Sequence, residues 1–134
     1  MSEHADQVAL FQWVARAKRG SHPELRLLFA VPNGGQRSKA TAGKLKAEGV
    51  QAGVPDICLP VPRGPYAACY IELKRMASPG RPAGKETPAQ KEWRLALMEA
   101  GNYACVCKGW SAARDVLEWY LAHEKPSYDA VGFG

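Results

Sequence analysis

The chain has 134 residues, which suits one domain built around one hydrophobic core. Hydrophobic residues make up 46% and charged residues 23%, as in an ordinary globular protein, and no apolar run approaches the roughly 20 residues that span a bilayer. The formal net charge of +5 (sequence pI about 9.1) suits a polyanionic partner but is also common in proteins without one.

The polar, acidic start MSEHADQ is not a signal peptide, so we expect a cytoplasmic protein with no membrane partner. The four cysteines lie in apolar runs and form no C-x-x-C pair, and the three histidines are scattered. This pattern does not indicate a zinc site and favours buried, reduced thiols.

The N-terminal stretch predicts a helix from Ser2 to about Lys18, with Ser2 as its N-cap. Helical spacing relates Ala5, Val8, Ala9, Gln12 and Ala15, and further apolar residues widen that surface. Residues 20–23, Gly-Ser-His-Pro, end the helix. Leu25 to Val31 then predicts a short strand.

Residues 32–35, Pro-Asn-Gly-Gly, break the chain before a helix-like stretch from Ser38 to Glu48. The exposed amides here, beside Arg37 and Lys39, suit a phosphate. The alternative is a simple turn followed by a solvated basic helix.

Two apolar runs follow, Ile57 to Leu59 and Ala67 to Lys74, with a Pro-Arg-Gly-Pro turn between them. Because side chains alternate along a strand, Tyr70, Glu72 and Lys74 share one face of the second run. If the two runs pair as a hairpin, Asp56 comes close to Glu72.

Two neighbouring carboxylates repel each other, and a divalent cation relieves that repulsion. Hard oxygen ligands favour Mg²⁺, with Mn²⁺ as a substitute. Lys74 then suits a role in activating water or stabilising charge on a phosphate. The alternative is a turn aspartate beside an edge-strand ion pair.

Residues 79–85 form the most loop-like segment, which follows Arg75 and contains Arg81 and Lys85. Only three residues separate Gly80 from Gly84, and Glu86 stands where a phosphate-binding loop has Ser or Thr. We therefore expect no nucleotide cofactor.

Thr87 begins a helix as its N-cap, with Pro88 at the first position and Gln90 completing a capping box. Gly101 is suited to end this helix, and its expected buried stripe comprises Trp93, Ala96, Leu97 and Ala100.

A strand from Tyr103 to Lys108 comes next, and Ser111 is expected to cap a last helix from Ala112 to about His123. We expect residues 1–124 to form the domain and 125–134 a flexible tail. The order of elements predicts an α/β sandwich with a mixed central β-sheet, the hairpin in its middle and helices on both faces.

The ordered set of motifs resembles the VRR-NUC (virus-type replication-repair nuclease) branch of the PD-(D/E)xK nucleases, over roughly residues 3–121. The motifs are Asn33-Gly34-Gly35, Gly53-x-Pro55-Asp56, Glu72-x-Lys74, Thr87-Pro-Ala-Gln90-Lys-Glu-Trp93 and Gly101. The resemblance implies a restriction-endonuclease-like fold and a bacterial or phage-infected host cell.

The resemblance also implies a Mg²⁺-dependent DNA endonuclease. It assigns metal binding to Asp56, Glu72 and the Leu73 carbonyl, and action on the attacking water to Lys74 and Gln90. Glu3 resembles a first-helix glutamate that reaches the metal, although an acid favoured by the helix dipole explains it equally well. The implied DNA contacts are Asn33, Gly34, Gly35, Arg37, Lys39, Arg75, Arg81 and Lys85.

Stand-alone members of this branch resemble nucleases that resolve four-way (Holliday) junctions as homodimers. We expect part of the aromatic surface of the terminal helices to form the dimer contact: Phe11, Trp13, Trp110, Trp119 and Tyr120. The alternative is that all five pack inside the monomer. The rival functions are a flap- or end-directed nuclease, a non-catalytic nucleic-acid-binding subunit of the same fold, and a small oligomeric structural protein.

Overall fold

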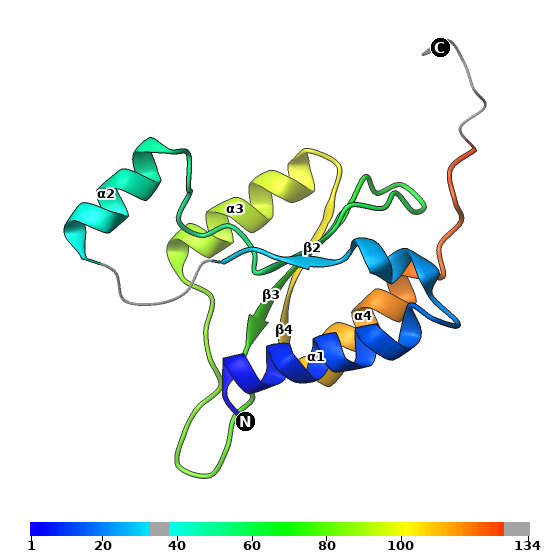
Figure 1. Cartoon of the computed structure of the whole chain (residues 1–134), viewed down its shortest axis with the longest axis horizontal. Helices are drawn as coiled ribbons and strands as arrows, with labels where there is room; N and C mark the ends of the chain where they lie inside the picture. The colour runs from blue at the N-terminus through cyan, green and yellow to red at the C-terminus, as the bar shows by residue number, and fades with distance from the viewer. Residues whose placement is uncertain (33–37, 128–134) are drawn as a thin grey trace.

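The computed structural model describes residues 1–32 and 38–127. Four α-helices, one 3₁₀ helix and four strands follow one another in this part of the chain (Figure 1). In chain order they are α1 (Glu3–Ala17), the 3₁₀ helix η1 (Pro23–Leu27), β1 (Phe29–Ala30), α2 (Lys39–Ala47), β2 (Ile57–Leu59), β3 (Cys69–Lys74), α3 (Pro88–Glu99), β4 (Tyr103–Lys108) and α4 (Trp110–Leu121).

The strands form one mixed sheet in the order β1-β2-β3-β4. β1 and β2 are antiparallel, β2 and β3 are antiparallel, and β3 and β4 are parallel with α3 as the connection. The predicted hairpin is thus confirmed and lies in the middle of the sheet.

Helices cover both faces of the sheet (Figure 1). α1 and α4 pack side by side on one face, where α4 contacts both β3 and β4, and α3 lies on the other face against β4. This arrangement is the predicted α/β sandwich with a mixed central sheet.

The hydrophobic core lies between the sheet and the α1–α4 pair. Leu10, Ile71 and Leu117 are fully buried there and come from α1, β3 and α4. Tyr120 is also fully buried, and its hydroxyl donates a hydrogen bond of 2.6 Å to the Val61 carbonyl oxygen. The last helix is therefore joined to the chain that follows β2 by both packing and a polar contact.

The stretch from Leu25 to Val31 is not the single strand that the sequence predicts. It forms the 3₁₀ helix η1 and then only the two-residue strand β1. Leu25 and Leu28 are both buried, whereas Leu27 is exposed. A spacing of three between buried residues fits 3₁₀ periodicity, whereas strand alternation would put Leu25 and Leu27 on the same face.

The buried stripe of α1 also differs from the expected one. It consists of Asp6, Leu10 and Val14, at a spacing of four, while Val8 is exposed. The selection of this stripe depends on where α4 lies, because the helix has apolar residues on several sides.

The last helix begins at Trp110 and not after Ser111. The Trp110 backbone N–H donates a hydrogen bond of 3.1 Å to Oδ1 of Asp6, a residue 104 positions earlier. The N-terminus of α4 is thus satisfied by an acid of α1, a tertiary contact that local sequence does not reveal.

The predicted capping box of α3 is confirmed, and Gly101 has φ of +96° just after the helix. The predicted stripe is not buried as expected, because Trp93 and Leu97 are only half-buried while Ala96 and Ala100 are exposed. The reason is that α3 lies over a partly polar face of the sheet and beside an open cleft.

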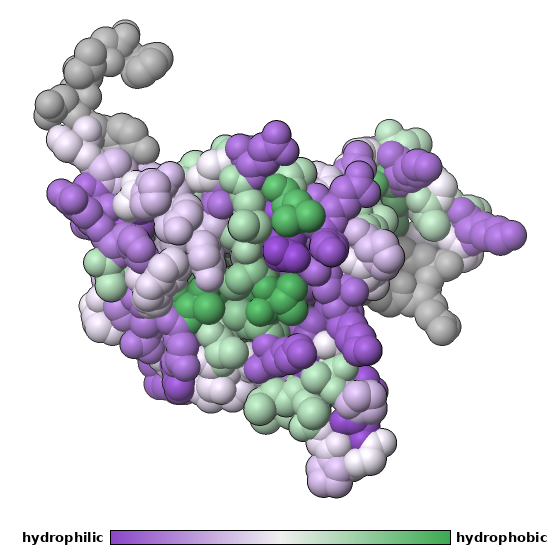
Figure 2. Space-filling view, turned by 180° about the vertical axis from the view of Figure 1, so that it is seen from behind, coloured by the Kyte–Doolittle hydropathy of each residue, from purple (hydrophilic) through white to green (hydrophobic). Residues whose placement is uncertain are grey.

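α2 stands away from the sheet and buries no residue (Figure 1). The face in Figure 2 carries polar areas between smaller apolar ones. None of the described helices is long and apolar enough to cross a membrane. Most of the predicted tail, residues 128–134, lies outside the described residues.

Candidate active site

The pairing of β2 with β3 brings Asp56 to Glu72. Ile57 pairs with Ile71, so the residue before Ile57 falls opposite the residue after Ile71. Oδ2 of Asp56 accepts a hydrogen bond of 2.9 Å from the Leu73 backbone N–H, which fixes the aspartate against the end of β3. The expected proximity of the two acids is present in the structure.

The two faces of β3 carry different chemistry, as its sequence predicts. Ile71 and Leu73 are buried in the core under α1 and α4. Glu72 and Lys74 point to the opposite face, where they are only 3% and 8% exposed. An acid and a base are thus held on one rigid strand with little freedom to move.

The carboxyl group of Glu72 lies in an unfavourable environment for a charge. Among the described residues its Oε2 is buried and has no hydrogen-bond partner. Burial first, and then the neighbouring Asp56, raises the pKa of Glu72 to about 9, although Lys74 opposes that rise. The group therefore holds its proton near neutral pH unless a positive charge arrives.

This donor set fits a divalent metal ion. One buried carboxylate oxygen has no partner, a second carboxylate lies beside it, and both offer hard oxygen atoms. Across residues 1–32 and 38–127, however, no group of three or more His, Cys, Asp or Glu side chains gathers to form a complete protein cage. The pair therefore suits Mg²⁺ or Mn²⁺, ions that keep several water ligands.

The structure does not bring Glu3 to this pair. Its side chain is exposed in the first turn of α1, although Figure 1 shows that turn near the end of the sheet where β3 finishes. The acid that α1 buries is Asp6, which is 2% exposed and bound to the start of α4. Asp6 lies one helical turn before the buried Leu10, and this spacing is the sequence signal that Asp6, and not Glu3, is buried.

Lys74 is enclosed by the loop that follows it. A Cβ added at Gly84 would lie 3.3 Å from the Lys74 Cβ, and the Gly84 N–H donates to the Arg75 carbonyl. Glu86 follows closely and forms a 2.6 Å ion pair with Arg94 of α3. The loop is thus attached to both β3 and α3, and it places Lys74 in a narrow space.

Gly53 explains the Gly-x-Pro-Asp pattern before β2. Its φ is +91°, and a Cβ there would lie 2.7 Å from the carbonyl carbon and oxygen of Ala89. Only glycine permits both this conformation and this close approach of two backbones. The contact holds the chain leading to Asp56 against the first turn of α3.

Gln90 serves as a helix cap in this structure. Its Oε1 accepts a hydrogen bond of 2.8 Å from the Thr87 N–H, and its own N–H donates to the Thr87 hydroxyl. A direct role in catalysis would require another rotamer, so that role stays a prediction.

The predicted DNA contacts are spread over three segments. Asn33, Gly34, Gly35 and Arg37 lie outside the described residues. Lys39 is exposed at the start of α2, and Arg81 and Lys85 are exposed on the loop after β3. Figure 1 shows this loop projecting beyond the sheet.

Arg75 differs from the other predicted contacts because its guanidinium donates to the Pro82 carbonyl. It therefore supports the fold of the loop in addition to any contact with DNA.

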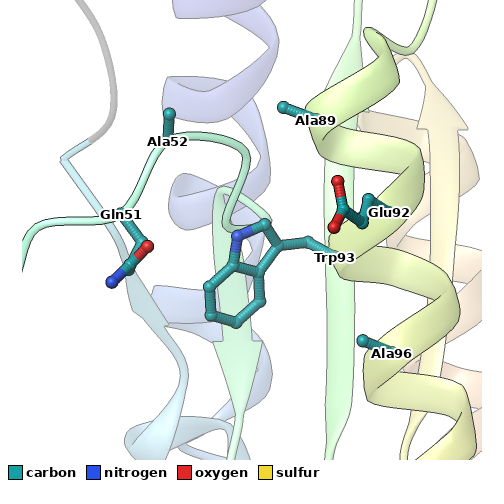
Figure 3. Close-up of a pocket in the computed structure, with 6 residues that line it drawn as sticks. All are labelled: Gln51, Ala52, Ala89, Glu92, Trp93 and Ala96. Carbon is teal, nitrogen blue, oxygen red and sulfur yellow. The ribbon is translucent and has the colours of Figure 1, made fainter.

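A cleft lies between α3 and the segment that joins α2 to β2 (Figure 3). Its volume is about 420 Å³. We call it the Trp93 cleft, and its lining residues are Gln51, Ala52, Ala89, Glu92, Trp93 and Ala96. The sequence predicts Trp93 as part of the buried stripe of α3 and of a family motif, but it does not predict the cleft.

Comparison with solved structures shows which family this chain resembles. A protein described as "VRR_NUC domain protein" superimposes with a TM-score of 0.78 and 29% sequence identity, over 93% of this chain and 92% of that one. The chain is thus similar in fold and in sequence, over most of its length, to a VRR-NUC domain protein. A scan against models of protein families gives no match, and neither does a search of curated proteins.

The similarity to a VRR-NUC domain protein supports nuclease chemistry of the PD-(D/E)xK type in general. Folds of this kind generally use a divalent metal ion, which agrees with the unpartnered carboxylate oxygen of Glu72. The roles of the two acids and the lysine in that chemistry stay a prediction.

The burial of Glu72 beside Asp56 predicts that the metal-free domain is stabilised by Glu72→Gln. An ionised glutamate costs free energy in the folded state, and glutamine does not. Because the folded pKa is raised above the unfolded one, wild-type stability falls as pH rises from about 4.5 to about 9. In EDTA at pH 8 we expect Glu72→Gln to raise the free energy of unfolding by about 1–3 kcal/mol.

Thermal melts at pH 5 and pH 8 measure this difference. The exposed residue Glu99 on α3 supplies the control, because Glu99→Gln should change stability by less than about 0.5 kcal/mol at either pH. The stability difference between Glu72→Gln and wild type should be larger at pH 8 than at pH 5. An equal difference at both pH values would contradict an environment that disfavours the charge of Glu72.

Proposed function

We propose that this VRR-NUC-like domain is a Mg²⁺-dependent DNA endonuclease that cuts phosphodiester bonds in branched DNA, with four-way junctions as its substrate and a homodimer as its active form. The observation that carries the proposal is the buried Glu72 beside the half-buried Asp56, with Lys74 on the same face of β3 as Glu72. The junction and the homodimer rest on the family resemblance and on symmetry.

The residues divide the chemistry among them. Asp56, Glu72 and the Leu73 carbonyl would hold the ion, which when bound supplies Lewis-acid stabilisation of charge on the phosphate. Lys74 is placed to orient a water molecule beside the scissile bond and to offset developing negative charge. The loop over Lys74 limits its motion, and the exposed Arg81 and Lys85 are placed to contact phosphates further along the backbone.

A non-catalytic DNA-binding subunit of the same fold is the rival function. A binding surface gains nothing from a buried carboxyl oxygen that has no hydrogen-bond partner among the described residues, because such an atom lowers stability. The retention of Glu72 in this environment, next to Asp56, favours catalysis.

The aromatic residues of the terminal helices support a dimer less than the sequence suggests. Tyr120 is fully buried, and Phe11, Trp13 and Trp110 are half-buried against the monomer core. Trp119 is 45% exposed, yet it packs on Tyr103. The proposed dimer is therefore supported mainly by the two-fold symmetry of a four-way junction, which requires two matched cuts.

Substitutions in the site should remove cleavage. We expect Asp56→Ala and Glu72→Gln to abolish Mg²⁺-dependent cutting while DNA binding persists, because these groups hold metal and not the backbone. Lys74→Ala should lower the rate about 10²–10⁴-fold and preserve metal binding, because an ammonium group is not a ligand. Gel assays on labelled DNAs with Mg²⁺, Mn²⁺ or EDTA measure this, with Glu99→Ala as the control, and wild-type cutting by either acid variant would refute the site.

The loop after β3 should contribute to affinity without sequence preference. Replacing Arg81 and Lys85 together by alanine should weaken binding to all DNAs alike and reduce the slope of log K against log salt by about 1.4–1.8. Arg16 and Arg19, exposed at the far end of α1, give a matched control pair with the same loss of charge. An equal effect of both pairs would show that only net charge matters.

The oligomeric state and the substrate should be linked. We expect light scattering to report two chains on each four-way junction, and we expect cleavage of the junction to exceed that of linear duplex. A monomer with and without junction DNA would remove the paired-cut mechanism and favour a flap- or end-directed nuclease.

A further inference from the structure

The Trp93 cleft is bordered by the segment that leads to Asp56, and the proposed catalysis does not use it. Figure 3 shows the indole ring projecting from α3 towards Gln51 and Ala52, with Ala89 and Ala96 above and below it on the helix. The small side chains leave the space beside the ring open. A flat slot with one aromatic wall suits a flat aromatic ligand.

The polar groups of the cleft match the edge of a nucleobase. Gln51 can both donate and accept hydrogen bonds, and Glu92 can accept from an amino group. None of the described residues that line the cleft is a lysine or an arginine. Among these residues a phosphate would meet one carboxylate and no cation, so their charge favours an uncharged base over the backbone.

The position of the cleft couples it to the acid pair. Ala89 lines the cleft and also contacts Gly53, the residue that leads the chain towards Asp56. Ala52 is four positions before Asp56, so their Cα atoms lie within about 14 Å of each other. Because bases in one strand are spaced by about 3.4 Å, a strand whose phosphate is at the acid pair reaches the cleft within a few nucleotides.

We propose that the Trp93 cleft binds one unpaired nucleobase of the DNA, stacked on the indole ring, a few nucleotides from the cut. This inference rests on the proposed nuclease function and adds a specificity site to it. A base at a branch point or in a single strand enters without cost, whereas a paired base must first leave its stack at a cost of about a few kcal/mol. The cleft therefore selects DNA with unpaired nucleotides near the cut over perfect duplex.

A fluorescent base tests the proposal directly. Four-way-junction and flap DNAs carry one unpaired 2-aminopurine at successive positions around the cut, and the protein carries Glu72→Gln so that the DNA stays intact. We expect strong quenching at one or two adjacent positions with Trp93 present, and its loss with Trp93→Leu. Affinity should fall about 5–150-fold, the equivalent of 1–3 kcal/mol of stacking.

Two further variants separate stacking from damage to the fold. Ala96→Leu fills the cleft while Trp93 stays in place, so it should also remove the quenching. Trp119→Leu alters another partly exposed tryptophan, on α4, and should leave the quenching unchanged. Thermal melts of all three variants confirm that they are folded.

An abasic nucleotide at the quenched position completes a double-mutant cycle with Trp93→Leu. If the base stacks on Trp93, the abasic DNA weakens binding to the parent protein but not to Trp93→Leu. Equal weakening in both proteins, or quenching that survives Trp93→Leu, would overturn the cleft proposal while wild-type cleavage still supports the nuclease. A wild-type protein that neither binds nor cuts any of these DNAs would overturn both proposals.

Discussion

Two neighbouring carboxylic acids impose the main constraint on this structure, because one of them buries an oxygen that has no hydrogen-bond partner among the described residues. Water solvates such a pair well and a protein interior does not, so the fold must hold Asp56 and Glu72 together against their own electrostatics. The hydrogen bond from the Leu73 N–H to Asp56 and the hairpin register achieve this through the backbone. The resulting loss of stability is the kind that functional sites retain.

The two faces of β3 separate stability from chemistry. Ile71 and Leu73 join the core with Leu10 and Leu117, and this apolar layer stabilises the strand from one side. Glu72 and Lys74 can then face the other side without needing to contribute to packing. Asp6 strengthens the apolar layer indirectly, because it joins the start of α4 to α1 and so keeps both helices against the sheet.

The features that the sequence predicts correctly depend on neighbours along the chain. The alternation of β3, the capping box at Thr87 and Gln90, and the hairpin between β2 and β3 are all local patterns, and each is present. The errors arise where tertiary packing decides. A 3₁₀ helix with Leu25 and Leu28 buried forms where the sequence predicts a strand. An acid from α1, and not Ser111, accepts the hydrogen bond at the start of α4.

The residues of the candidate site also differ in how far local sequence places them. Asp56, Glu72 and Lys74 are predictable because strand geometry places them. Which acid of α1 is buried, Glu3 or Asp6, depends on how α1 is rotated on its neighbours. Position 6 continues the buried stripe of Leu10 and position 3 does not.

One backbone contact connects the chemistry to the Trp93 cleft. Gly53 approaches Ala89 so closely that any side chain would force the two segments apart. Asp56 follows one of these segments, and Trp93 lies one turn along the other, on α3. The distance between the acid pair and the cleft is therefore set where the segment before Asp56 is held against the first turn of α3. A site that acts on a phosphate and reads a nearby base needs this fixed spacing, because an error of about 1 Å between them would weaken one function when the other is satisfied.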